Sequence, residues 1–163
     1  MWYNEGEWGG NMLSKPKSGW TEFKLDKTSY SLSYLTDVSM SWLDSAINGL
    51  KDLKPFVVHG FLEPLRMMCV VSFYNIHLFV EDEDNVALDP NESNYEIIHM
   101  NMLKFCEHLY NDIKDNLKEW VNWFCDDETD LDKREKELNK KLEELRKLID
   151  KQKEYFSDSC CFF

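Results

Sequence analysis

Apolar and polar positions alternate in the first patterned part of the chain. Between Trp20 and Leu25, and again between Tyr30 and Tyr34, large side chains interleave with polar ones, and residues 26–28 form a short polar connection. A period of two residues interrupted by a polar turn is typical of a β-hairpin. The sequence therefore predicts two paired strands here.

The period then changes to that of a helix. The apolar residues that mark it are Leu43, Ala46, Ile47 and Leu50. Either Asp37 or Ser39 can accept hydrogen bonds from the free N–H groups of a first helical turn, and Pro55 places the end of this short helix near Leu53.

Three apolar runs of strand length follow, at residues 56–62, 66–73 and 76–80. They are rich in β-branched and aromatic residues, and turns that contain Pro64 and Asn75 separate them. Such composition favours β-strands. Together with the hairpin, these runs predict a sheet of five strands, with the short helix inserted after the second.

The C-terminal part of the chain predicts two long helices. From Ile98 to Phe124, apolar residues recur in steps of three and four, which corresponds to an amphipathic helix of about seven turns. After an acidic linker at 126–132, a second helix carries a leucine seam, formed by Leu138, Leu142, Leu145, Ile149 and Phe156. We expect the seam to pack within the chain and the protein to be a monomer; homodimerisation through the seam is the alternative.

These elements predict an α+β fold: an antiparallel sheet of about five strands, a short inserted helix, and a C-terminal pair of long helices packed on the sheet. We expect one domain at 20–156. It is preceded by a loosely ordered aromatic arm, residues 1–19, and followed by a tail, residues 157–163. The ending Cys160-Cys161-Phe162-Phe163 fits a loose prenylation pattern, but without a polybasic run we interpret it as a frayed tail.

Negative charge is concentrated in two windows. The net charge is −12, yet residues 67–103 and 119–132 carry thirteen carboxylates and no Lys or Arg. The negative electrostatic field of these windows favours a basic protein partner and disfavours direct binding to nucleic acid. The alternative is that the two windows are solvated surface without a binding role. The residues that we assign to partner binding are Glu81, Asp82, Glu83, Asp84, Asp89, Glu92, Asp126, Asp127, Glu128 and Asp130.

No catalytic, cofactor-binding or metal-binding motif is found in the sequence. Phosphate-binding glycine loops and nucleophile elbows are absent, and the five cysteines include no C-x-x-C pair. His59 and His77 fall on neighbouring predicted strands but lack a third ligand at metal-binding spacing. We therefore expect no enzymatic activity, no cofactor and no metal. No signal peptide or membrane-spanning run is present, so we expect a cytoplasmic protein without membrane contact.

Part of the chain between residues 20 and 124 resembles small acidic bacterial proteins that are encoded beside toxins as immunity proteins. The segments that carry the resemblance are Gly19-Trp20-Thr21, Tyr34-Leu35-Thr36-Asp37-Val38, Leu43, Ala46-Ile47, Leu50, Lys54-Pro55 and Trp120-Val121-Asn122-Trp123-Phe124. The resemblance implies a stoichiometric protein inhibitor without catalysis. The long charged last helix departs from this pattern, so the resemblance assigns no inhibitory residues.

Two other functions fit the same description. A phage-encoded inhibitor of a host defence nuclease would also be small, acidic and non-catalytic, and would block a basic cleft as a mimic of nucleic-acid phosphates. A structural or assembly subunit would instead oligomerise through the leucine seam.

Overall fold

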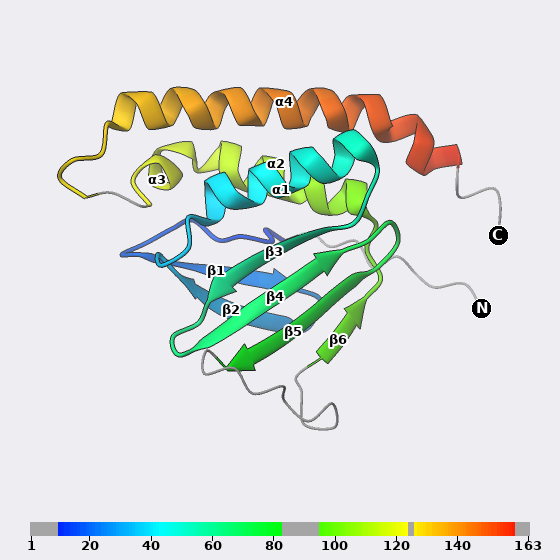
Figure 1. Cartoon of the computed structure of the whole chain (residues 1–163), viewed down its shortest axis with the longest axis horizontal. Helices are drawn as coiled ribbons and strands as arrows, with labels where there is room; N and C mark the ends of the chain where they lie inside the picture. The colour runs from blue at the N-terminus through cyan, green and yellow to red at the C-terminus, as the bar shows by residue number, and fades with distance from the viewer. Residues whose placement is uncertain (1–9, 83–94, 124–125, 159–163) are drawn as a thin grey trace.

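The computed structural model of the chain describes residues 10–82, 95–123 and 126–158. The described strands form two antiparallel sheets, and the helices pack on one side of them, which confirms the predicted α+β class (Figure 1). The elements in chain order are β1 (Trp20–Leu25), β2 (Thr28–Ser33), α1 (Val38–Asp52), β3 (Phe56–Phe61), β4 (Leu65–Val71), β5 (Ile76–Asp82), β6 (Tyr95–Ile98), α2 (Met102–Asp115), α3 (Leu117–Val121) and α4 (Leu131–Asp158).

The predicted hairpin is confirmed as β1 and β2. One face of it is buried, because Phe23 and Leu25 alternate with more exposed residues and Leu32 faces the same side. Leu32 lies against the backbone of Gly60 in β3. The hairpin therefore packs on the core side of the second sheet, in which the strands follow the order β3-β4-β5-β6.

Three details of the prediction are wrong. The five expected strands do not form one sheet, since the hairpin is a separate sheet and a sixth strand, β6, completes the other. Ile98, expected to begin a long helix, instead pairs with Ile76. The helix starts only after Asn101, whose Oδ1 accepts a hydrogen bond from the N–H of Lys104 at 2.7 Å. It is also divided at Asn116, where φ is −122° and ψ is 35°. Short apolar runs fit a strand and a helix equally well, which explains why the residues of β6 were assigned to the helix.

The leucine seam packs within the chain, as expected. In Figure 1, α4 lies across α1 and α2, which separate it from the sheets. The buried residues of α4 are Leu138, Leu142, Leu145, Ile149, Gln152 and Phe156. Gln152, which interrupts the seam, donates from Nε2 to the carbonyl oxygen of Leu50 in α1 at 3.1 Å. Because the seam is already covered, it offers no free apolar stripe to a second copy.

The described half of the N-terminal segment is held firmly, which differs from the expected loosely ordered arm. Met12 and Leu13 are buried, and the N–H of Lys24 in β1 donates to the carbonyl oxygen of Met12 at 2.8 Å. Leu13 also donates its N–H to the carboxylate of Asp112 in α2 at 2.8 Å. Trp2, Tyr3 and Trp8 lie outside the described residues.

A close contact between α1 and β3 gives the first prediction. The ring of Phe56 lies so near Gly49 that an added Cβ would overlap it. We expect Gly49→Ala to destabilise the protein by about 1–3 kcal/mol, despite a gain in helix propensity of roughly 1 kcal/mol. Chemical denaturation measures the effect. Gly10→Ala is the control, because nothing lies within 4 Å of its added Cβ. Equal stability of the two variants would contradict the contact.

Candidate protein-binding surfaces

The acidic turn, residues 126–132, precedes α4, includes the first two residues of that helix and lies at one end of the molecule. The carboxylate of Asp126 accepts hydrogen bonds from Thr129 Oγ1 at 2.8 Å and from the N–H of Glu128 at 3.1 Å. These bonds lower the pKa of Asp126. Asp130 accepts from the N–H of Lys133 at 3.0 Å and so caps the start of α4. Asp126 and Asp130 therefore shape the turn.

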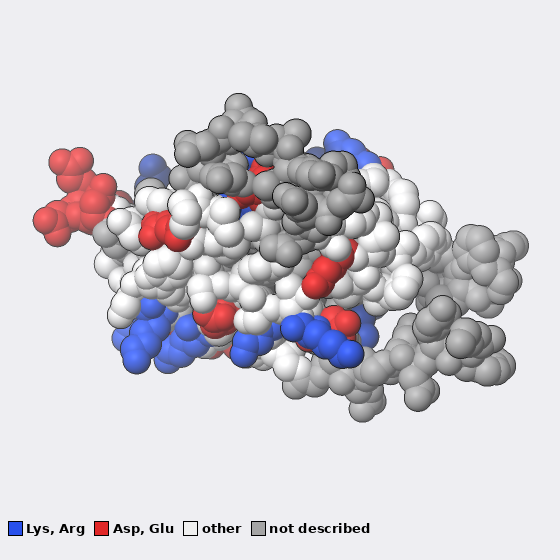
Figure 2. Space-filling view, turned by 90° about the horizontal axis from the view of Figure 1, so that it is seen from below, with Lys and Arg blue, Asp and Glu red and all other residues white. Residues whose placement is uncertain are grey.

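The other acidic side chains of the turn project into solvent. Asp127, Glu128 and Asp132 are exposed, and the described structure gives their carboxylates no ion-pair partner. Figure 2 shows a group of acidic side chains standing out from this end of the molecule. The structure therefore brings together Asp126, Asp127, Glu128 and Asp130 of the predicted binding residues.

A network around Arg134 fixes the first turn of α4 next to the acidic turn. The guanidinium donates to both carboxylate oxygens of Asp37, the N-cap residue of α1, at 2.6 and 2.9 Å. It also donates to the carbonyl oxygens of Val121 at 3.0 Å and Trp120 at 3.3 Å, at the end of α3. One side chain thus joins three helices behind the acidic residues.

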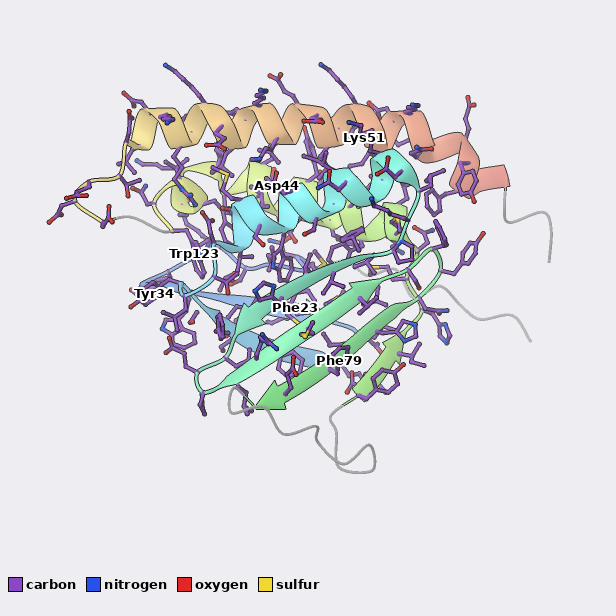
Figure 3. The ribbon with its side chains drawn as sticks, viewed as in Figure 1. Phe23, Tyr34, Asp44, Lys51, Phe79 and Trp123 are labelled. Carbon is purple, nitrogen blue, oxygen red and sulfur yellow. The ribbon has the colours of Figure 1, made fainter. Side chains whose placement is uncertain are left out.

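A second contact positions the end of α3. Trp123 Nε1 donates to the carbonyl oxygen of Thr36, just before α1, at 2.9 Å. Trp123 and the half-exposed Tyr34 both lie at this end of the molecule (Figure 3). Residues 16–19, together with Lys118, Glu119, Asn122 and Trp123, line a cleft of about 260 Å³ here, and the Glu119 carboxylate pairs with Lys15 at 2.8 Å.

In the other acidic window, residues 67–103, the structure describes 67–82 and 95–103. Glu81 in β5 accepts from Arg66 in β4 at 2.6 Å, so its charge is paired. Asp82 ends β5 opposite Leu65, and its side chain is outside the described part of the structure. Glu83, Asp84, Asp89 and Glu92 also lie outside the described residues. Their assignment to partner binding stays a prediction.

The four-stranded sheet has an outward face that no described helix or strand covers (Figure 1). Its side chains form three rows across the strands, because cross-strand partners point to the same side of a sheet. None of these residues is buried, and Val57, Tyr95 and Ile97 are 42%, 50% and 51% exposed. The rows are Val57-Val70-His77-Ile97, His59-Met68-Phe79-Tyr95 and Phe61-Arg66-Glu81.

Sequence analysis did not single out this face, although a signal was present. The runs at 56–62, 66–73 and 76–80 are almost continuously apolar, whereas a strand with one solvated face alternates apolar and polar residues. Continuous apolar runs predict a sheet that is covered on both sides. The described helices and hairpin cover only one.

The histidines of this face are engaged locally. His77 Nδ1 is hydrogen-bonded to the hydroxyl of Tyr95 at 2.6 Å, and the His59 ring packs edge-on against Phe61. Partial burial, assisted by Arg66, lowers the pKa of His59. Within the described residues, no group of three or more His, Cys, Asp or Glu side chains is arranged to hold a metal ion.

Cys69 and Cys106 are buried free thiols in the core. Burial raises the pKa of both groups, and for Cys106 the nearby Glu107 adds to the effect. Because the thiolate is the nucleophilic form, these cysteines are unreactive packing residues.

Asp112 is a buried carboxyl group, only 3% exposed. Burial raises its pKa to about 6, although the N–H groups of Leu13 and Met12 oppose the shift. Since the folded chain binds this proton more tightly than the unfolded chain, Asp112 adds stability as the pH falls below its folded-state pKa. This contribution is nearly absent at and above about pH 7 and complete below the unfolded-state pKa near 4.

We therefore expect the wild type to gain about 1 kcal/mol between about pH 7 and pH 5 relative to Asp112→Asn, whose amide oxygen can still accept from Leu13. Denaturation of both proteins across this range measures the difference. The control is Glu143→Gln, at an exposed position of α4. Parallel pH profiles for the wild type and Asp112→Asn would refute the shifted pKa.

None of the described helices is both long enough and apolar enough to span a membrane. Comparison with known proteins found no family model, no curated protein and no solved structure that matches this chain.

Proposed function

We propose that the protein is a non-catalytic inhibitor that binds a basic protein partner, as an immunity protein of a bacterial toxin system does. The observation that carries the proposal is the acidic turn, in which Asp127, Glu128 and Asp132 are exposed on a segment braced by its own hydrogen bonds. A preformed acidic surface attracts a basic partner over a distance and loses little entropy when it binds.

The proposed place of action is the cytoplasm. Two buried free thiols, Cys69 and Cys106, support a reducing compartment, because disulfides are typical of oxidising ones.

Isolation of the chain with its partner tests this function. We expect the chain, expressed in the cell that encodes it, to copurify with one basic protein in equal amount. Added back at equal concentration, the purified chain should abolish the activity of that protein. Undiminished activity at a large excess of the chain would contradict inhibition.

The identity of the partner separates the two inhibitor hypotheses. A toxin encoded in the same cell supports the immunity function. A defence nuclease of the host supports the alternative of a phage-encoded inhibitor, which the same acidic turn favours because its carboxylates can occupy positions of nucleic-acid phosphates.

A further inference from the structure

Three large apolar side chains are exposed at the end of the molecule that carries the acidic turn. Tyr34 and Leu35 are each 50% exposed in the connection between β2 and α1, and Leu131 is 40% exposed at the first position of α4. Connections normally carry Gly, Pro, Asn, Asp or Ser instead. A single exposed apolar residue needs no explanation, but a group with charged residues around it is typical of a protein-binding site.

Hydrogen bonds bring these three residues into one surface. Leu131 lies one helical turn before Arg134, whose guanidinium bonds Asp37 at 2.6 and 2.9 Å, and Leu35 lies two residues before Asp37. One helical turn is about 5 Å long, and two residues span at most about 7 Å. A standard interface covers about 800 Å² of each partner and is therefore roughly 30 Å across. Tyr34, Leu35 and Leu131 fit within one such interface.

The connection that carries two of these residues is held in place by the rest of the fold. A Cβ added to Gly19 would lie 3.0 Å from Cδ1 of Tyr34, so the Tyr34 ring packs against that turn. The carbonyl oxygen of Thr36 accepts a hydrogen bond from Trp123 Nε1 at 2.9 Å. Because this surface is preformed, it loses little entropy when a partner binds.

Carboxylates lie around this apolar group. Leu131 stands between Asp130 and Asp132 in the chain, and residues 126–133 hold five carboxylates and one basic residue, Lys133, which gives this segment a net charge of −4. Figure 2 shows the acidic side chains standing out from this end of the molecule. The charge next to the exposed apolar residues is therefore negative.

We propose that Tyr34, Leu35 and Leu131 form the apolar centre of the surface on which the basic partner docks, an inference that rests on the proposed function. The partner that fits has an apolar pocket bordered by Lys or Arg side chains that lie over the acidic turn. Lys17 and Lys118 line the neighbouring cleft, so the partner's basic side chains do not lie there. Tyr is enriched among the residues whose truncation weakens binding most, which makes Tyr34 the expected anchor.

Charge selects this partner over a second copy of the chain. A symmetric dimer through this surface would bring the same residues of both copies together, and with them two acidic turns of the same sign. Like charges that face each other disfavour such an interface, whereas Lys or Arg around the partner's pocket is attracted to the turn.

The apolar centre and the acidic turn act on different rate constants. Exposed charges of the turn accelerate encounter, and burial of the apolar centre slows dissociation. Salt screens the exposed charges but does not weaken apolar burial in the same way. Substitutions in the apolar centre should therefore change the dissociation rate at low and high salt alike.

The rate at which the purified partner dissociates tests the apolar centre. We expect Tyr34→Ala to make dissociation about tenfold faster or more at both low and high salt, with association changed less than about twofold. Tyr155→Ala is the matched control, because Tyr155 is 46% exposed near the other end of α4, and it should change neither rate more than about twofold. Equal dissociation rates for the two variants would overturn the docking surface.

A second variant leaves the packing of Tyr34 on Gly19 in place. Leu35→Gln with Leu131→Gln replaces two exposed apolar side chains by polar ones, so the fold loses little buried surface. We expect the partner to dissociate from this variant about tenfold faster or more. A dissociation rate equal to that of the wild type would contradict the proposal even if Tyr34→Ala were poorly folded.

Photo-crosslinking with the purified partner locates the contact. The photoreactive residue p-benzoylphenylalanine is placed at Leu35, at Leu131 or, as control, at Tyr155. Irradiation of the mixture should join the partner to positions 35 and 131 and not to position 155. Adducts of two copies of the chain, with twice the mass of 19.5 kDa, would overturn the proposal.

Failure of the docking surface is distinguishable from failure of the proposed function. A partner that copurifies and is inhibited, but dissociates from both variants at the wild-type rate, would overturn the docking surface alone. Absence of any copurifying partner would overturn both.

Discussion

Arg134→Ala is expected to lower the free energy of unfolding by about 2–4 kcal/mol, somewhat less than the loss of a fully buried ion pair. The side chain of Arg134 is 10% exposed and that of Asp37 is 26% exposed, so water screens the pair only in part. The substitution leaves the Asp37 carboxylate and the carbonyl oxygens of Trp120 and Val121 without this donor. Three helices lose a shared contact at once.

Arg146→Ala on the same helix is the control. It measures how much stability is lost when an arginine outside the Arg134 network is removed. Arg146 pairs with Asp150 one turn away at 3.3 Å, and both side chains are about half exposed. Exposed pairs of this kind contribute about 0–0.5 kcal/mol, and the contact of the Arg146 guanidinium with the Tyr110 ring of α2, 5.6 Å from its centroid, adds about 0.5–1 kcal/mol. Urea denaturation of Arg134→Ala and Arg146→Ala should therefore differ severalfold in effect. Similar losses would show that the bonds of Arg134 to α1 and α3 contribute little.

The parts of the fold in which apolar residues recur with one clear period could be predicted from the sequence. Alternation defined β1, and the leucine seam from Leu138 to Phe156 defined the buried side of α4. The seam's intramolecular packing also followed, because the apolar faces of the preceding helices needed a partner. These signals are local, and so they can be read from residue spacing.

The parts that could not be predicted depend on contacts between distant residues. Ile97 and Ile98 belong to β6 only because β5 offers them a hydrogen-bonding edge, through the pairs Ile76↔Ile98 and His77↔Ile97. The hairpin forms its own sheet because Leu32 packs over Gly60 instead of pairing beside it. Arg134 was indistinguishable in sequence from the exposed basic residues of α4, since its partner Asp37 is 97 residues away.

The candidate binding surfaces could also be predicted only in part. Charge concentration located the acidic turn, but only the structure separates Asp126 and Asp130, which shape the turn, from Asp127 and Glu128, which project from it. The apolar outward rows of the sheet required the strand register, because residues such as Val57 and Ile97 join one row only across three strand pairings.

Charge reversal in the acidic turn tests the central claim most directly. Asp127→Lys with Glu128→Lys changes two exposed residues and leaves the hydrogen-bonding side chains of Asp126 and Asp130 in place. We expect association with the purified basic partner to slow about tenfold or more at low ionic strength, and the difference to shrink as salt is added. The matched control is Glu143→Lys with Glu144→Lys, two exposed residues in the middle of α4 that produce the same change in net charge.

The measurement is the association rate constant of the wild type, the turn variant and the α4 control, each determined by stopped-flow mixing over a series of salt concentrations. The account predicts a large, salt-dependent loss for the turn variant and a much smaller one for the control, because steering depends on where the charge lies. Equal losses in both variants would mean that only net charge matters. An association rate unchanged by reversal of Asp127 and Glu128 would contradict the claim that the acidic turn recognises a basic partner.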